Sequence, residues 1–523
     1  MLNRRRSHSV TTIKRLSTTA TETKTKLDIL LNEFVNHEQR GVPKNAGTNT
    51  KQGFDLERMR LLLKEGFENP HEKNKYKIVH VGGTKGKGTV LTLIKSVLER
   101  SGYRVGTYKS PHVHSFAERI RVNGESNDEE LCDLFNESVE RVREVKKKNA
   151  LTIMKTNEHS VAVKEEEEVS HFEVLTALAL KYFEVKNVDI ALVEVGLGGS
   201  RDATNVFDEN SLECAVLTHI GEEHLDALGG SIETIVEAKT GICKKNKPVF
   251  IAPQRKKVEN LLREAVASHG AYIIENNAEV TLMNLSSSIL PSSPSSCSSS
   301  SLAPIVQTVN ISVSPRNKIR EGETLTVINE VNLPLLGPHQ RENSALAVSV
   351  LSWMKSSGNW DKITSESIRD GLESCSSFTS PGNFEIIKSG SDGNTIIADG
   401  AHTQEAAACL RKTIGEVFPD FPVVFVIAMA SDKNHAGITL ELSQTPGMLE
   451  MVATKVDVAG KSLRSTEPEI IAKDQNFKGA VVRDFLSAIR YAENVLKKQG
   501  KRGIICVTGS LHSVTRAKRE IYI

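Results

Sequence analysis

Short buried runs and amphipathic stretches alternate along the first two thirds of the chain. Residues 77–82 have the pattern of a buried strand that runs into a glycine-rich loop, and residues 90–100 continue with helical spacing. Similar patterns predict strands at 188–195, 215–219 and 248–252, and helices at 27–34, 54–64, 174–183 and 340–352. Strands that alternate with helices predict an α/β fold with a mostly parallel sheet.

The alternation of predicted strands and helices begins again after a change of composition near residues 374–382. Strands are expected at 395–398, 423–429 and 503–508, with helices at 404–417 and 485–499. We therefore expect an N-terminal domain over 27–375 and a smaller, Rossmann-like α/β domain over 380–523.

Two polar stretches interrupt the first domain. Residues 144–168 end in four consecutive glutamates, and residues 286–301 contain 11 serines in 16 positions. Segments with so few apolar side chains cannot pack into a core. We expect flexible surface inserts at 144–168 and 286–304.

Charge, hydropathy and cysteine content exclude several classes of protein. The 523 residues include 67 Lys and Arg against 65 Asp and Glu, so a general nucleic-acid coat is not expected. The longest apolar runs, such as 423–430, have eight residues, whereas a bilayer span needs about 20. Seven scattered cysteines without a CxxC pair exclude a disulfide framework and a zinc ribbon, and favour a reducing compartment.

The nearly balanced net charge of the whole chain includes a strongly basic N-terminal leader. The first 26 residues carry seven Lys and Arg against Glu22 alone, are rich in Ser and Thr, and lack a secretory apolar core. This composition is typical of a mitochondrial transit peptide and predicts a disordered leader over 1–26 with a matrix location. The alternative is a basic tail that carries no targeting signal, on a cytoplasmic protein.

The strongest local motif is the glycine-rich loop that follows the first predicted strand. Its glycines let backbone N–H groups approach phosphate, Lys87 can reach the β- and γ-phosphates, and Thr89 can bind Mg²⁺. The common G-x-x-x-x-G-K-[ST] pattern is not met, because Val81 stands in its first glycine position and Gly88 separates Lys87 from Thr89. We predict an ATP phosphate site formed by Gly83, Thr84, Lys85, Gly86, Lys87, Gly88 and Thr89.

From this loop onward the chain resembles the folylpolyglutamate synthase and dihydrofolate synthase family, which is related to the Mur ligases. The resemblance runs in order through the loop and the segments 110–112, 118–124, 171–176, 194–199 with 202–205, 218–224 with 228–229, 239–242, 339–340 with 343, and 399–402. It covers about residues 50–520. It implies a P-loop ATPase domain of the Mur ligase type and a reaction that activates a carboxylate as an acyl phosphate for attack by glutamate.

The resemblance also implies roles for individual residues. Catalysis is expected from Lys87, Glu194, His224 and Lys239, with Lys239 carbamylated; taken alone, Lys239 is an ordinary helix lysine. Mg²⁺ ligands are expected at Thr89, Ser110, Glu194 and His224, and further ATP contacts at Asn343, Asp399 and His402. The pterin-side substrate region is expected at His171, Phe172, Glu173, Arg201 and Asp202, although helix packing alone would also account for Phe172.

Several positions depart from the family pattern. Ser200 precedes Arg201 where an Arg usually follows the GLGG glycines, and Ala238 stands before Lys239 where Glu is common. Asn383 replaces an Arg that normally helps to hold ATP, which puts that contact in doubt; Thr403 replaces an Asn.

The loop and the 237–241 segment resemble the plant dihydrofolate synthase branch. This favours dihydropteroate, L-glutamate and ATP as substrates. Separately, we expect a monomer that binds neither nucleic acid nor membrane. Folylpolyglutamate synthesis, both activities together, or a non-catalytic nucleotide-binding module are the alternatives.

Overall fold

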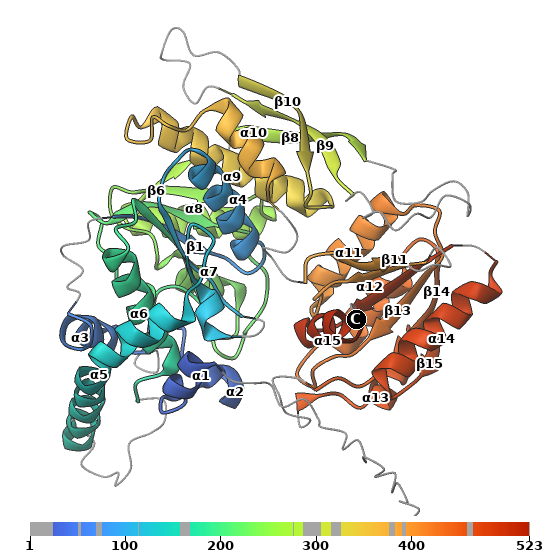
Figure 1. Ribbon diagram of the computed structural model, residues 1–523, viewed down its shortest axis with the longest axis horizontal. Helices are drawn as coiled ribbons and strands as arrows, with labels where there is room; N and C mark the ends of the chain where they lie inside the picture. Colours follow the sequence, from blue (N-terminus) through green and yellow to red (C-terminus); the bar gives the residue numbers. More distant parts are fainter. Residues whose placement is uncertain are drawn as a thin grey trace, which may run out of the picture.

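The chain folds into two α/β units (Figure 1), with the C-terminal unit in orange and red. The computed structural model describes residues 25–50, 54–68, 76–112, 115–156, 168–275, 277–285, 305–314, 326–375, 382–389, 394–457, 464–500 and 502–521. Most of the predicted leader and the serine-rich insert lie outside these ranges, while Thr25 caps the first helix. None of the helices in the described ranges has the length and hydropathy to cross a bilayer.

A seven-stranded sheet forms the centre of the N-terminal unit. Its strand order is β3-β2-β4-β1-β5-β6-β7, and only β3 runs antiparallel to its neighbour. Because β1 lies between β4 and β5, the carboxyl ends of these three strands share one edge. The strands are β1 Lys77–Gly82, β2 Val105–Tyr108, β3 Ile120–Val122, β4 Ile190–Glu194, β5 Leu212–Leu217, β6 Pro248–Ile251 and β7 Tyr272–Ile274.

Helices cover both faces of this sheet. Alternate β1 residues face opposite ways: Ile78 joins one core cluster and Val79 the other. The first face is covered by α1 Lys26–Leu31, α3 Leu56–Leu61 with a π-turn Leu62–Gly66, α5 Asp128–Thr156, α6 His171–Val185, α7 Ile232–Thr240 and α8 Lys256–Ser268. The second is covered by α4 Lys87–Arg100, α9 Pro338–Ser356 and α10 Ser365–Glu373. Short segments α2 His37–Arg40 and the 3-10 turn Phe116–Arg119 complete the layer.

A small antiparallel sheet of order β10-β9-β8 extends the second face. Its strands are β8 Ala278–Leu285, β9 Gln307–Val313 and β10 Thr326–Leu333. Alternate residues of β9, such as Val309 and Ile311, are buried in the same cluster as α9 and α10. The sequence analysis did not predict this sheet, because its strands flank the serine-rich stretch and β8 alternates too weakly to stand out.

The C-terminal unit has its own six-stranded sheet of order β11-β12-β16-β13-β14-β15, with only β11 antiparallel. The strands are β11 Glu385–Ser389, β12 Thr395–Ala398, β13 Val423–Ile427, β14 Met448–Ala453, β15 Gly479–Val481 and β16 Ile504–Thr508. Around it pack α11 Gln404–Val417, α12 His435–Ser443, α13 Pro468–Ala472, α14 Phe485–Lys498 and α15 Leu511–Ile521. The predicted fold, a mostly parallel sheet followed by a smaller α/β unit, is confirmed.

The first polar insert differs from its prediction. The helix α5 continues to Thr156, so residues 144–156 are helical and the loop expected there was wrong. Polar residues are compatible with a helix when only one side packs: Val142 and Val145 are buried while neighbouring charged side chains face outward. Residues 157–167 lie outside the described ranges.

Candidate active site

The phosphate loop joins β1 to α4 and is held by the end of β5. Thr84 N–H and Lys85 N–H both donate to the carbonyl of His219, at 2.8 and 3.2 Å. Gly83 has φ +134°, and a Cβ at this position would lie 2.0 Å from Thr218 Oγ1. Only glycine fits so close an approach between the loop and the neighbouring strand end.

The first turn of α4 is open to an anion. The helix starts after Gly86, whose φ of +92° places it in the left-handed region, and no side chain caps the turn. The first backbone N–H groups of a helix have no intrahelical acceptor and carry partial positive charge. The predicted loop therefore has the geometry of a phosphate cradle.

Lys87, Glu194 and Ser110 lie close together beside this turn. Lys87 Nζ lies 3.9 Å from Glu194 Oε1, and Ser110 N–H donates to Glu194 Oε2 at 3.4 Å. Burial raises the pKa of Glu194, and the nearby charges of Lys87 and Lys109 oppose that shift. A buried carboxylate facing cations can exchange them for a metal ion.

Lys239 lies beneath the same loop. Its side chain is buried, and Nζ donates to the carbonyl of Gly83 at 2.8 Å. Burial, reinforced by the charge of Lys87, lowers the pKa of Lys239 to about 7. A large fraction of this amine is neutral near pH 7 and is therefore nucleophilic.

His224 and Glu223 occupy the turn that follows β5. Desolvation lowers the pKa of His224 to about 4, so its ring is neutral near pH 7. Glu223 Oε1 accepts from Lys85 Nζ at 2.6 Å and lies 3.8 Å from His402 Nε2. Although burial opposes ionisation, Lys85 holds the pKa of Glu223 below its usual value. Glu223 was not predicted as a site residue, although it directly precedes His224 in the same motif.

The C-terminal unit contributes Asp399 and His402 from the end of β12. Asp399 accepts from the backbone N–H groups of Phe384 and Ala401, both at 2.9 Å, and burial raises its pKa to about 6. His402 Nδ1 pairs with the carbonyl of Gly400 at 2.7 Å, so this nitrogen carries a proton. Asn383 lies directly before Phe384, where the resemblance led us to expect Arg.

Asn343 projects from α9 onto the phosphate loop. A Cβ on Gly86 would lie 2.6 Å from Asn343 Oδ1, while Asn343 Nδ2 donates to Gln340 Oε1 at 3.1 Å. The amide is therefore held close to the start of α4, where a nucleotide contact was expected.

Two predicted substrate residues have their oxygen atoms engaged within the protein. Glu173 Oε2 closes the capping box of α6 with Ser170, and Oε1 accepts from Arg58 Nε at 2.8 Å. Asp202 accepts from Leu197 N–H at 2.7 Å and from Thr204 N–H at 3.0 Å. Both carboxylates anchor backbone beside the predicted substrate region.

The remaining residues predicted for that region are Phe172, His171 and Arg201. Phe172 packs over Gly196, where a Cβ would lie 2.5 Å from the ring, and stands 5.9 Å from the Tyr108 ring centroid. His171 is buried, and its Nδ1 lies 3.1 Å from the Val35 carbonyl oxygen. Arg201 Nε is buried without a hydrogen-bond partner in the described part of the chain.

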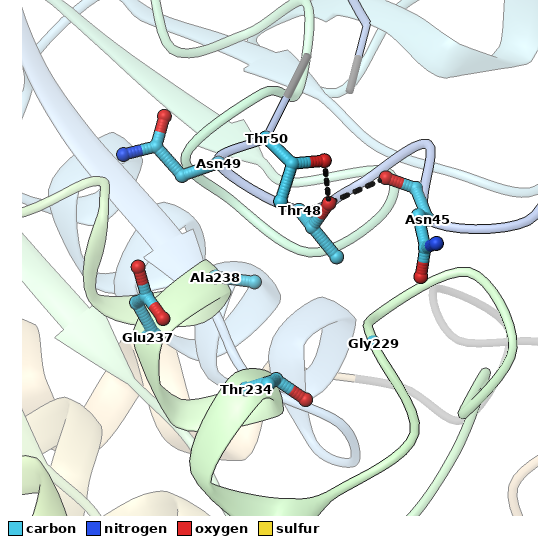
Figure 2. A pocket seen from close by; sticks show the side chains of 8 residues that line it. All are labelled: Asn45, Thr48, Asn49, Thr50, Gly229, Thr234, Glu237 and Ala238. Carbon is cyan, nitrogen blue, oxygen red and sulfur yellow. Dashed lines mark hydrogen bonds between the residues drawn. The ribbon is translucent and has the colours of Figure 1, made fainter. Parts of the chain in front are cut away.

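A cavity of about 460 Å³ lies between the 45–50 segment and α7, and Figure 2 shows the side chains that line it. Thr48 Oγ1 bonds Asn45 O and Thr50 Oγ1, which orders the wall formed by that segment. Ala238, next to Lys239, belongs to the opposite wall. Gly229, Glu237 and Ala238 belong to segments that carry the family resemblance, whereas the other lining residues were not predicted from the sequence: Asn45, Thr48, Asn49, Thr50 and Thr234.

Residues 138–351 match the Mur ligase middle domain family. The dihydrofolate synthase/folylpolyglutamate synthase of Bacillus subtilis is 27% identical over 455 residues, which is 86% of this chain and 92% of that protein. The chain is therefore similar over most of its length to folylpolyglutamate and dihydrofolate synthases. A probable dihydrofolate synthetase of Schizosaccharomyces pombe is also 27% identical, over 87% of this chain and 95% of that protein.

A solved structure extends this homology to the fold. Folylpolyglutamate synthase of Mycobacterium tuberculosis, crystallised with ADP and AMPPCP, is 25% identical with a TM-score of 0.69 and covers 94% of this chain and 98% of that one. The homology therefore spans both α/β units and supports ATP as the nucleotide of these enzymes.

Of the metal ligands expected from the sequence, one carboxylate and two hydroxyls have the chemistry that Mg²⁺ prefers. Within the described ranges, no group of three or more His, Cys, Asp or Glu side chains could hold a metal alone. Mg²⁺ needs only one or two carboxylates and fills its other positions with water and phosphate oxygens. Glu194 with the hydroxyls of Thr89 and Ser110 provides such a set, whereas the imidazole of His224 is a less preferred ligand.

Proposed function

We propose that this chain is an ATP-dependent ligase that joins L-glutamate to 7,8-dihydropteroate, giving 7,8-dihydrofolate, ADP and phosphate. The observation that carries the proposal is the meeting of Lys87, Glu194 and Ser110 at the open first turn of α4. The homologous synthases, which are ATP-dependent ligases, support the same reaction class.

The chemistry begins with two anions that must approach each other. The pteroate carboxylate attacks the γ-phosphorus of ATP, ADP leaves, and an acyl phosphate forms. Lys87 and the N–H groups of the loop lower the repulsion between carboxylate and triphosphate. Mg²⁺ bound by Glu194, Thr89 and Ser110 would neutralise further phosphate charge. The glutamate amine then attacks the acyl carbon, phosphate leaves, and the amine loses a proton.

Lys239 supports this site through its neutral amine. Its nitrogen can add to dissolved CO₂, forming an N–C bond and releasing one proton, which gives a carbamate anion. A carbamate beside the Gly83 carbonyl would replace a cation near the metal with an oxygen donor. Crystals grown with bicarbonate at pH 8 should show density for a carbamate on Nζ, and a bare amine there would remove this part of the proposal.

The choice of dihydropteroate rests on the sequence of the loop and of residues 237–241. The alternative is extension of tetrahydrofolate by further glutamates, since relatives of similar identity include folylpolyglutamate synthases and bifunctional enzymes. A non-catalytic module is disfavoured because Lys87 and Glu194, a cation and a carboxylate suited to phosphoryl transfer, lie together with Ser110 at the loop.

One assay separates these activities. The chain should be produced without residues 1–24 rather than 1–26, because Thr25 caps α1 and Leu27 is buried. With Mg-ATP and glutamate, dihydropteroate should give dihydrofolate and ADP in equal amounts, and hydroxylamine should trap the acyl phosphate. Product from tetrahydrofolate alone would establish the alternative, and turnover with neither substrate would favour the binding module.

A further inference from the structure

Lys109, which was not predicted as a site residue, lies close to the Glu194 carboxylate. It follows β2 directly and precedes Ser110, whose N–H donates to Glu194 Oε2 at 3.4 Å. A Cβ on Gly88, in the first turn of α4, would lie 3.5 Å from Glu194 Oε2 and 4.0 Å from Lys109 Nζ. The amine and the carboxylate therefore face the same turn, next to Thr89.

Hydrogen bonds hold Lys109 in this position. Its Nζ donates to Thr92 Oγ1 at 2.9 Å, and Thr92 Oγ1 in turn donates to the carbonyl of Gly88 at 2.6 Å. The backbone N–H of Lys109 donates to the carbonyl of Arg119 at 3.0 Å. The amine is therefore anchored to α4 at a fixed place beside the carboxylate.

Two lysines and one carboxylate determine the charge of this region. Lys87 Nζ lies 3.9 Å from Glu194 Oε1, and Lys109 lies on the other side of the Gly88 turn. Burial lowers the pKa of Lys109 and raises the pKa of Glu194, but the charge of each side chain opposes the shift of the other. With both amines protonated, these three groups together carry a net charge of about +1.

This charge determines which ligand Glu194 can bind first. A divalent cation on its own is attracted by one carboxylate and repelled by two ammonium groups at short range. The phosphates of a nucleotide bring several negative charges to the same turn and reverse this balance. Binding of a divalent cation is therefore favoured only when phosphate is present.

We propose that Lys109 is a positioning residue that acts through Glu194: its fixed positive charge keeps a lone divalent cation out of the site, so that Mg²⁺ enters together with the phosphates of the nucleotide. The inference rests on the proposed function, because it needs Glu194 to be a metal ligand at a phosphate site. It assigns to Lys109 a task separate from the transfer of phosphate.

Mn²⁺ added without nucleotide tests the exclusion of the metal in the full chain. The electron paramagnetic resonance signal of free Mn²⁺ should show that Lys109→Met binds one Mn²⁺ about tenfold or more tightly than the wild type, because one repelling charge is lost. Lys109→Arg keeps the charge and should behave as the wild type. Adding Glu194→Gln to Lys109→Met should remove the new site. Lys95→Met, which removes a lysine paired with Glu99 further along α4, is the matched control and should match the wild type.

Nucleotide binding without metal supplies a readout of opposite sign. Calorimetric titration with ADP in EDTA should show about threefold to tenfold weaker binding by Lys109→Met, because the phosphates lose a nearby cation. A folding defect would weaken the binding of both ligands, so tighter Mn²⁺ binding with weaker ADP binding distinguishes the proposed role from damage to the loop. Equal or weaker Mn²⁺ binding by Lys109→Met, or unchanged ADP binding, would overturn this inference alone. Failure of the wild type to bind Mg-AMPPCP would overturn the proposed function as well.

Discussion

Lysines of the same type have different tasks at this site because their surroundings differ. Lys85 is paired with Glu223, Lys87 faces Glu194, and Lys239 is buried against a carbonyl. The sequence predicted all three through one loop and one motif. It could not predict Glu223 as the partner of Lys85, since that pairing depends on how segments far apart in the sequence meet in space.

Removing the charge of Lys87 should abolish most of the activity. In Lys87→Met, kcat/KM for ATP should fall about 100-fold or more, because a cation is lost where phosphate charge develops. The control is Lys77→Met at the opposite end of β1, where the lysine is exposed and bonds only the carbonyl of Asn210. Coupled measurement of ADP release checks both variants, and near-normal turnover of Lys87→Met would contradict the assignment.

Stability should depend on pH through Lys239. Its pKa is about 7 in the folded chain and about 10.4 when unfolded, so the unfolded chain binds more protons between these values. The free energy of unfolding should therefore rise with pH in that window, by up to about 1.4 kcal/mol per pH unit from this group. Below pH 7 Lys239 is protonated in both states, so the folded chain bears the full free-energy cost of burying its charge.

Lys239→Met isolates this contribution. In bicarbonate-free buffer the variant should be more stable than the wild type at pH 6, and the gap in urea denaturation should narrow as the pH rises toward 10. A gap that stays constant with pH would show that the buried amine does not titrate in this window.

At the scale of elements, the strand, loop and helix around the phosphate site were the most predictable part. The ranges predicted for β12 and α11 equal those in the structure. Their apolar runs end where the elements end, and Thr403 caps the start of α11. The three-stranded sheet was not predictable, since its pairing joins residues 278–285, 307–313 and 326–333 across long polar gaps. No helix was predicted over any part of α5, and its residues from 144 onward were expected to be a loop, because only a narrow apolar side runs along it.

A pair of glycines tests how tightly the loop packs on β5. Gly83 and Gly102 both have positive φ, but only a Cβ on Gly83 meets another atom, Thr218 Oγ1 at 2.0 Å. Gly102→Ala should cost about 1–2 kcal/mol from backbone strain alone. Gly83→Ala should cost about 1–3 kcal/mol more and weaken ADP binding. Equal costs in urea denaturation would mean that the close approach is relaxed in solution.

At the scale of the whole molecule, the two units contact each other through α9 and α11. Arg341 on α9 bonds Glu416 on α11 and Gln307 on β9, both at 2.8 Å, and Gly337 stands directly against Thr413. The same helix carries Asn343 to the phosphate loop. The sequence predicted two units but not this junction, because nothing local in a helix pattern marks an inter-unit salt bridge.

Breaking this junction should separate the two units without unfolding either. In Arg341→Met, thermal unfolding should split into two transitions, and KM for ATP should rise several-fold because the C-terminal contacts are no longer held in place. Arg263→Met, which breaks an exposed pair with Glu275 on one unit, is the control and should leave a single profile. Calorimetry distinguishes these results, and unchanged cooperativity in Arg341→Met would contradict the role of the junction.

The packing of α10 on α4 also has a consequence for synthesis on the ribosome. Gly371 lies so close to Val97 that an added Cβ would stand 2.5 Å from its Cα, and both helices share one apolar cluster with β1. A ribosome that adds about 5–20 residues per second needs about 15–60 s to pass from β1 to the end of α10. For that time the face of β1 and α4 that α9 and α10 will cover stays open to water. The growing chain is therefore a natural client for chaperones that shield apolar surface.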